Sequence, residues 1–383
     1  MNSFLESGLC VLAAGLFGVV GFGPASASEI GVSDKTILLG QSAALSGPAA
    51  KLGANMNLGA RIYFDAVNAR GGIYGRKIEL RVKDDGYESE RARQNTLDLV
   101  HKDGVFALFG YVGTPTSNAA APIYTENRVP FFGAYTGASS LREPFNRYVF
   151  NVRASYIDET ERIVDQLTTT GTNRIGVFYQ NDAYGKAGLE GVNRAMDRRH
   201  LKVTALATVE RNSVDVSEAM KTLRAADPNA IVQISAYASC AALIQSLRAA
   251  GYTGQFVNVS FVGSQELADA LGPSGSGVMI TQVVPFPWSN VSPLQREYTA
   301  ALKAAGITTP DFGTMEGYIA ARVFVEGLRR AGRDLTREGL IAALETLRDY
   351  DLGGFTITYS PENHNGSRFV EITMIGSHGN FVK

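Results

Sequence analysis

The sequence has few residues of the types that carry enzyme chemistry. Its 383 residues include only 2 Cys and 4 His. It has no His-Glu-x-x-His motif, no Gly-x-Ser-x-Gly turn and no phosphate-binding loop ending in Gly-Lys. We therefore expect no enzymatic activity, no cofactor and no metal ion. The histidines are expected to be solvated or to cap helices; they are His101, His200, His364 and His378.

An excess of charge of either sign is also missing. The 36 basic and 37 acidic residues give a formal net charge of −1. We expect no nucleic-acid partner and no attraction to an anionic membrane surface. Cys240 lies in an apolar stretch without a Cys-x-x-Cys partner, so it is expected to be a buried small hydrophobe.

The N-terminus holds one apolar run, residues 9–20, which is shorter than the roughly 20 residues of a membrane-spanning helix. Residues 21–24 break the run, and Ala25-Ser26-Ala27 fits a signal cleavage site. We expect residues 1–27 to be a cleaved signal peptide, which exports the chain to the periplasm with no later membrane insertion. Residues 1–8 contain no Lys or Arg, so either the signal is atypical or translation starts elsewhere. Lipidation at Cys10 is a weaker alternative.

From residue 37 onward, strand and helix patterns alternate. Residues 37–40 read as a short buried strand, and Met56, Ala60, Tyr63 and Val67 recur at helical spacing. Residues 77–83 then alternate between polar and apolar, as a strand with one wet face does. A second series begins near residue 156. The pattern predicts an α/β protein with parallel sheets in two domains.

Several segments along the chain carry a signal more specific than this alternation of strands and helices. They are 37–53, 66–76 with the closing Asp84-Asp85, 110–114, 181–185 and 316–321. Together they resemble the branched-chain amino acid (Leu/Ile/Val) binding protein family over nearly the whole mature chain. The resemblance implies a type I periplasmic binding protein with two Rossmann-like lobes on a three-segment hinge. It places one lobe at 28–152 plus 284–368 and the other at 153–283 plus 369–383.

The same resemblance implies a function. The chain would be the periplasmic substrate-binding component of an ABC transporter. It would capture a small carboxylate-bearing solute between the lobes, as a monomer, and deliver it to a permease of the branched-chain amino acid type. A ligand-sensing protein that partners a separate membrane receptor is the alternative, since both roles use this fold.

Two loops are expected to bind the ligand carboxylate. Thr114 follows a strand and is expected to cap a helix that begins at Pro115, where free N–H groups attract anions. The hydroxyls of Thr114 and Thr116 would donate to the carboxylate. In the second loop, the resemblance implies binding through the Ala134 carbonyl, the Thr136 hydroxyl and the ring of Tyr135. The alternatives are a cap that serves only its own helix and an ordinary turn.

The resemblance also places Tyr184 and Tyr237 of the second lobe over the ligand, and Leu52 against its side chain. Packing between elements would explain each of these residues as well. The main departure is Ser260-Phe261, where the amino-acid binders carry an acidic residue for the ligand's ammonium group. Burying an unpaired ammonium is costly, so an aromatic or other organic acid rivals a branched-chain amino acid as ligand. Glu266 is expected to be a solvated helix carboxylate.

Overall fold

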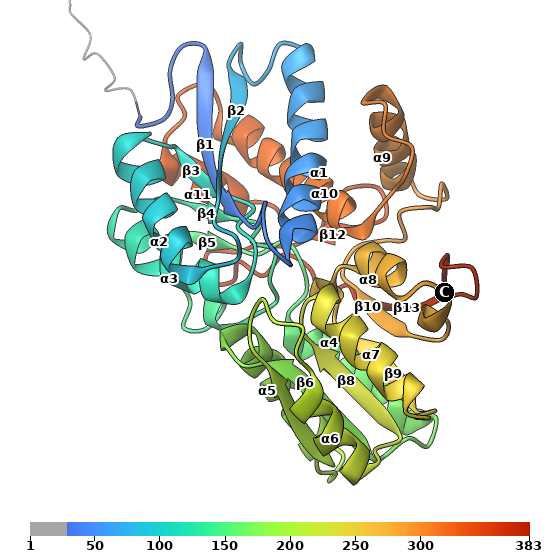
Figure 1. Cartoon of the computed structure of the whole chain (residues 1–383). Helices are drawn as coiled ribbons and strands as arrows, with labels where there is room; N and C mark the ends of the chain where they lie inside the picture. The colour runs from blue at the N-terminus through green and yellow to red at the C-terminus, as the bar shows by residue number, and fades with distance from the viewer. Residues whose placement is uncertain (1–28) are drawn as a thin grey trace, which may run out of the picture.

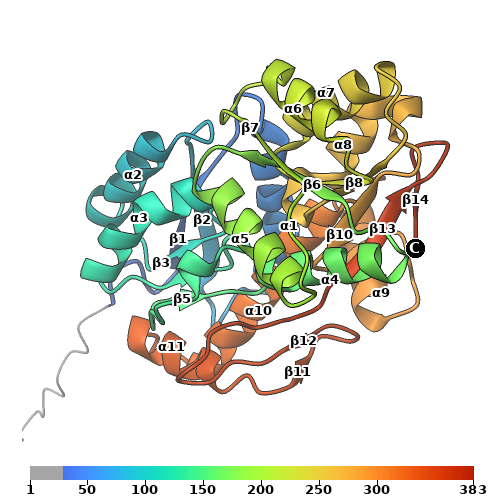
Figure 2. The same cartoon turned by 90° about the horizontal axis from the view of Figure 1, so that it is seen from below.

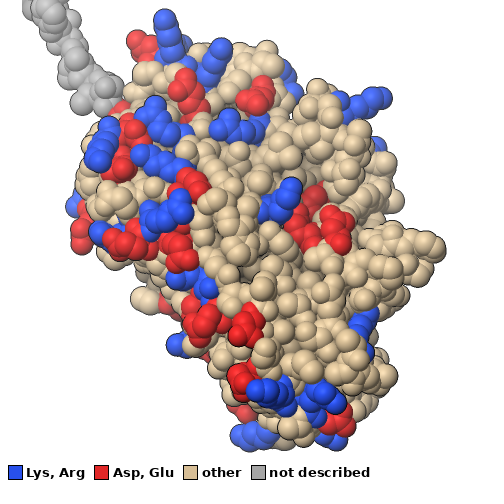
Figure 3. Space-filling model, viewed as in Figure 1, with Lys and Arg blue, Asp and Glu red and all other residues tan. Residues whose placement is uncertain are grey.

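The computed structural model describes residues 29–383 and shows two α/β lobes that meet along a common boundary (Figure 1). The predicted signal peptide lies outside the described residues. Within the described part, no helix is both long enough and apolar enough to cross a membrane. Basic and acidic side chains are interspersed over the face in Figure 3, as the balanced composition predicts.

The first lobe is built on a five-stranded parallel sheet in the order β2-β1-β3-β4-β5. Its strands are β1 (Thr36–Ala43), β2 (Lys77–Asp84), β3 (Ala107–Phe109), β4 (Phe131–Phe132) and β5 (Val149–Phe150). Its helices are α1 (Ala50–Ala69), α2 (Ser89–Leu97), α3 (Thr114–Glu126), α9 (Pro293–Ala304), α10 (Phe312–Ala331) and α11 (Arg337–Glu345). Helices α1 and α10 approach closely at Gly59, where a Cβ atom would lie only 1.9 Å from the Thr314 carbonyl oxygen. A larger residue there would force the two helices apart.

The second lobe is built on a seven-stranded sheet in the order β14-β13-β10-β9-β8-β6-β7. Its strands are β6 (Ile175–Gln180), β7 (Ala205–Val209), β8 (Ala230–Ile234), β9 (Gln255–Asn258), β10 (Met279–Gln282), β13 (Glu371–Ile375) and β14 (Phe381–Val382). Strand β13 pairs antiparallel with both β10 and β14, and the other neighbouring strands pair parallel. Its helices are α4 (Tyr156–Thr169), α5 (Ala183–Asp197), α6 (Ser217–Ala226), α7 (Tyr237–Ala249) and α8 (Ser264–Leu271). Cys240 on α7 is fully buried and free, as predicted.

The chain changes sheets three times, between β5 and β6, after β10 and before β13. This confirms the predicted two-lobed α/β class, while the residue-level domain limits stay a prediction. Strand β12 (Thr356–Ile357) lies apart from both of these sheets, because it pairs with β11 (Tyr350–Asp351) in a separate two-stranded ribbon. Figure 2 shows this ribbon beside α10 and α11, away from the second sheet.

Candidate functional site

Two threonine hydroxyls meet where β3 and β4 end. The Oγ1 atoms of Thr114 and Thr136 share a hydrogen bond of 2.7 Å, and the Thr136 hydroxyl also bonds the Tyr156 hydroxyl at 3.2 Å. Thr114 was expected to be the N-cap of α3, but the cap is Gly113 and Thr114 is the first helical residue. Glycine is required at the cap, since its φ is 96° and a Cβ there would lie 2.2 Å from the Tyr87 ring.

Two other predicted carboxylate ligands have partners within their own loops. The Thr116 hydroxyl donates to the carbonyls of Val112 and Gly113, the latter at 3.0 Å. The Ala134 carbonyl accepts the Thr136 N–H at 2.9 Å. Thr114 and Thr136 are therefore the hydroxyls best placed to turn toward a ligand.

Aromatic rings from both lobes meet around Phe261. Its ring centroid lies 4.5 Å from that of Tyr184, 5.5 Å from that of Tyr135 and 5.9 Å from that of Tyr87. Burial raises the pKa of each of the three tyrosines well above its usual value, so their hydroxyls stay neutral. Tyr135 and Tyr184 therefore pack against the same ring, and the group provides an apolar wall with neutral hydroxyls.

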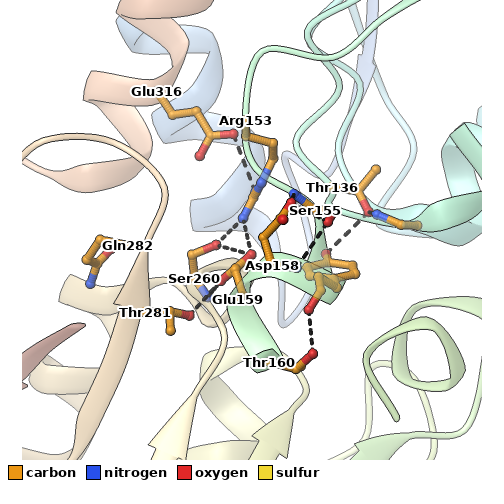
Figure 4. A network of polar contacts seen from close by, with 12 residues as sticks. Thr136, Arg153, Ser155, Asp158, Glu159, Thr160, Ser260, Thr281, Gln282 and Glu316 are labelled. Atoms are coloured by element: carbon orange, nitrogen blue, oxygen red, sulfur yellow. Dashed lines mark hydrogen bonds and ion pairs between the residues drawn. The ribbon is translucent and has the colours of Figure 1, made fainter. Parts of the chain in front are cut away.

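Ser260 takes part in a buried charge network (Figure 4). Its N–H and hydroxyl donate to the two carboxylate oxygens of Glu159 at 2.7 and 3.0 Å, and the Arg153 guanidinium bonds its Oγ. The Glu159 carboxylate also accepts from the Thr281 hydroxyl at 2.6 Å. An acidic group therefore does lie beside the loop after β9, but it comes from α4 and is saturated by the protein itself.

Arg153 connects this network to the first lobe. Only 1% of its side chain is exposed; it lies 3.2 Å from Glu159, 3.4 Å from Glu316 on α10, and 5.0 Å from the centre of the Tyr135 ring. Burial raises the pKa of Glu316 to about 7, although Arg153 acts to lower it. Within residues 29–383, the Nε and Nη1 atoms of Arg153 have no hydrogen-bond partner.

The lobes are also bonded to each other at two places on either side of the rings. At the first, which we call the ionic edge, Glu88 accepts from Arg211 Nη2 at 3.0 Å and from Asn212 Nδ2 at 2.7 Å. At the second, the carboxyl edge, Asn55 Nδ2 on α1 donates to Glu266 of α8 at 2.8 Å and to Asp311 at 3.1 Å. Asp311 is the N-cap of α10.

Leu52 and Tyr237 lie at the carboxyl edge rather than among the central rings. A Cβ at Gly263 would lie 2.7 Å from a Leu52 methyl and 3.3 Å from the Tyr237 ring. Leu52 is 2% exposed, and Tyr237 is half-buried and contacts the Lys51 backbone. The ten predicted site residues therefore all lie near the lobe boundary, in four groups, and their contact with a ligand stays a prediction.

Two expectations about charged side chains are wrong. Glu266 is not a solvated carboxylate, because α8 turns it toward Asn55 and Asp311. His364 is not solvated either: it is 2% exposed and stacked on Phe150, and burial lowers its pKa to about 4. In both cases the contacting residues are remote in sequence, so the local position of Glu266 or His364 along the chain could not predict its burial.

Sequence reasoning also missed Tyr87, Arg153 and Glu316. Glu316 lies within a segment that carries the family resemblance, and Arg153 lies next to the predicted first crossover near residue 152. The position of Arg153 beside a predicted crossover could have indicated the ion pair, because a charged residue in a buried hinge needs a partner of opposite charge.

Comparison with known proteins agrees with this arrangement. A family model described as "Periplasmic binding protein" matches residues 36–380. The structure of a "possible leucine/isoleucine/valine-binding protein" from Rhodopirellula baltica SH 1 is 37% identical, with a TM-score of 0.86 over 92% of this chain and 96% of that one.

Two further relatives match at similar coverage. The structure of a "substrate-binding periplasmic protein" from Ralstonia solanacearum is 36% identical, with a TM-score of 0.85 over 90% of this chain and 99% of that one. "Leu/Ile/Val-binding protein homolog 3" from Brucella melitensis is 24% identical over 325 residues, which are 85% of this chain and 87% of the relative.

Proposed function

From the premise that the chain belongs to the periplasmic binding protein family, we propose that it is the substrate-binding component of an ABC transporter. It captures a small carboxylate-bearing solute between its lobes and hands it to a permease of the branched-chain amino acid type. It reaches the periplasm through a signal cleaved after residue 27 and acts as a monomer.

The observation that carries the proposal is the hydroxyl pair of Thr114 and Thr136 at the start of α3. The Tyr156 hydroxyl bonds Thr136, and the centroid of its ring lies 5.3 Å from that of Tyr184, so the pair lies beside the rings of the second lobe. A ligand carboxylate can replace the bond between the two hydroxyls, because each can then donate to an oxygen. The first N–H groups of a helix add a partial positive charge at the same place. Closure then buries the ligand body against the rings.

The ligand class depends on Phe261. The names of the Rhodopirellula and Brucella relatives favour leucine, isoleucine or valine, which carry an ammonium group. Here, a ring occupies the position expected to carry an acid, and the nearby Glu159 already has its own partners. The site between the hydroxyls of Thr114 and Thr136 and the rings around Phe261 therefore favours an acid with an apolar or aromatic body and no amino group. Glu266 at the carboxyl edge is the carboxylate available to an amino acid.

A melting panel tests the proposal. Residues 28–383 are partly unfolded to remove carried-over ligand, refolded, and heated with amino acids, aromatic acids, short aliphatic acids and the matching amides. A ligand that binds the folded form raises the melting temperature with concentration. We expect an acid to do so and its neutral amide not to. Shifts from amides alone would contradict the carboxylate site, and shifts from none of the compounds would contradict the proposal for these ligand classes.

The hydroxyl pair is then tested by Thr114→Val and Thr136→Val, which keep the side-chain shape. Each should weaken binding of the acid about tenfold, since a hydrogen bond to a charged group contributes about 1.5–3 kcal/mol. Thr168→Val is the matched control, because the Thr168 hydroxyl bonds only carbonyls of its own helix. Equal affinities in all three variants would remove Thr114 and Thr136 from the site.

A further inference from the structure

We propose that the carboxyl edge is a proton-dependent latch. Closure brings the Glu266 carboxyl of the second lobe onto the Asn55 amide of the first lobe, which also binds the Asp311 carboxyl of its own lobe. The lobes therefore close more readily when one of the two carboxyls carries a proton. The proposal rests on the hinged closure of the proposed function, but not on the identity of the ligand.

The geometry explains why the two carboxyls are coupled. Asn55 Nδ2 has two hydrogens, and its bonds of 2.8 Å to Glu266 and 3.1 Å to Asp311 use both. Asp311 must stay in place, because its Oδ1 also caps α10 through the Thr314 N–H at 3.0 Å. Glu266 belongs to the second lobe, so its approach to Asp311 depends on closure.

Among residues 29–383, the groups that shift the pKa of Glu266 most do not include a cation. Burial raises the pKa of Glu266 to about 7, and the charges that add most to this shift are Asp311 and Asp269, which are both acidic. The pKa of Asp311 is raised too, chiefly by burial. From the other packed elements, Tyr135 and Tyr237 face Glu266; both are neutral because burial raises their pKa values.

The sign of the pH effect follows from these shifts. In an open form, Glu266 faces water and returns toward its ordinary pKa of 4.5. The closed form then binds more protons than the open form between about pH 4.5 and 7. Its advantage is complete below this window and is lost as the pH rises through about 7. The closed-to-open ratio should fall about tenfold from pH 6 to pH 8.

Glu316 is another buried carboxyl near the boundary whose pKa is raised to about 7. It contacts Arg153 and not the carboxyl edge. Removal of the Glu266 charge should therefore reduce the pH dependence of closure without abolishing it.

The test is small-angle X-ray scattering of ligand-free 28–383 from pH 5.5 to pH 8.5, fitted to open and closed forms. We expect the wild-type chain to open as the pH rises. Glu266→Gln keeps the bond to Asn55 but cannot ionise, so it should remain closed at pH 8 and show a flatter profile. Asp311→Asn, which can still cap α10, is the second variant and should flatten the profile as well.

Glu88→Gln at the ionic edge is the matched control, because it also removes a carboxylate from a bond between the lobes. It should shift the protein slightly toward the open form by a similar amount at every pH and leave the steepness of the profile unchanged. A wild-type profile that does not change with pH would overturn the latch. So would wild-type steepness in both Glu266→Gln and Asp311→Asn. Neither result bears on the melting panel, so failure of the latch and failure of the transport proposal are distinguishable.

Discussion

The two edges of the lobe boundary make the same kind of connection with opposite electrostatics. At the ionic edge, a carboxylate meets a guanidinium and an amide, and the side chains of Glu88 and Arg211 are 45% and 24% exposed. At the carboxyl edge, two acids meet one amide, and Asp311 is only 7% exposed. The ionic edge attracts at neutral pH but is screened by salt. The carboxyl edge is more buried and attracts fully only after it takes up a proton.

The difference shows how a closing protein can control its own closure. Because a solvated ion pair contributes about 0–1 kcal/mol, the ionic edge guides the lobes together but stores little energy. Buried acids repel by more, so the carboxyl edge sets the equilibrium between open and closed forms. Between the edges, the network of Arg153, Glu159 and Glu316 supports both lobes.

The largest effect should come from removing this central support. Arg153→Met leaves Glu159 and Glu316 buried without their cation, so the free energy of unfolding should fall by about 3–5 kcal/mol. Urea unfolding at pH 8 measures the change. Arg162→Met is the control, since its exposed pair with Asp165 should contribute less than about 0.5 kcal/mol. Equal losses in the two variants would show that the network has no special role.

Gly263→Ala should break the carboxyl edge alone. Its φ of 83° disfavours a side chain, and a Cβ would lie 2.7 Å from a Leu52 methyl in the other lobe. We expect a loss of about 1–3 kcal/mol in unfolding free energy and a more open scattering profile. Gly251→Ala controls for the backbone strain, since its φ is 86° but no atom lies within 4 Å of its Cβ position. Opening in both variants would contradict the contact with Leu52.

The stability of the protein should also depend on pH through Glu266. Because the pKa of Glu266 is raised to about 7 in the closed protein, its ionisation lowers stability as the pH rises through that value. Glu266→Gln should therefore be about 1–2 kcal/mol more stable than wild type at pH 8 and nearly equal to it at pH 4.5. Thermal unfolding at the two pH values measures this. A variant less stable than wild type at pH 8 would contradict the assignment.

The smallest effect should come from the ionic edge. Arg211→Met should lower the melting temperature slightly at low salt, by the equivalent of less than about 1 kcal/mol, and not at all in 1 M salt. Calorimetry at both salt concentrations measures the change. A loss that persists in high salt would mean that the aliphatic part of Arg211, and not its charge, connects the lobes.

Local patterns predicted the elements of this fold well, because each sheet is made of short apolar strands that alternate with amphipathic helices. For the site, the family resemblance was needed to single out Thr136, and the two hydroxyls of Thr114 and Thr136 do meet, since both residues follow the ends of neighbouring parallel strands. Local patterns failed where a partner is remote. Asn55 and Glu266 are 211 residues apart, and Arg153 and Ser260 are 107 apart. No spacing within one helix or strand reports such a contact, so Arg153 was missed and Glu266 was expected in water.

Closure of the two lobes on a ligand can be measured as the radius of gyration of 28–383 before and after addition of the acid found in the melting panel. We expect a smaller radius with ligand at pH 8, where the carboxyl edge favours the open form. A ligand that binds tightly and leaves the radius unchanged would show that the lobes do not close on it.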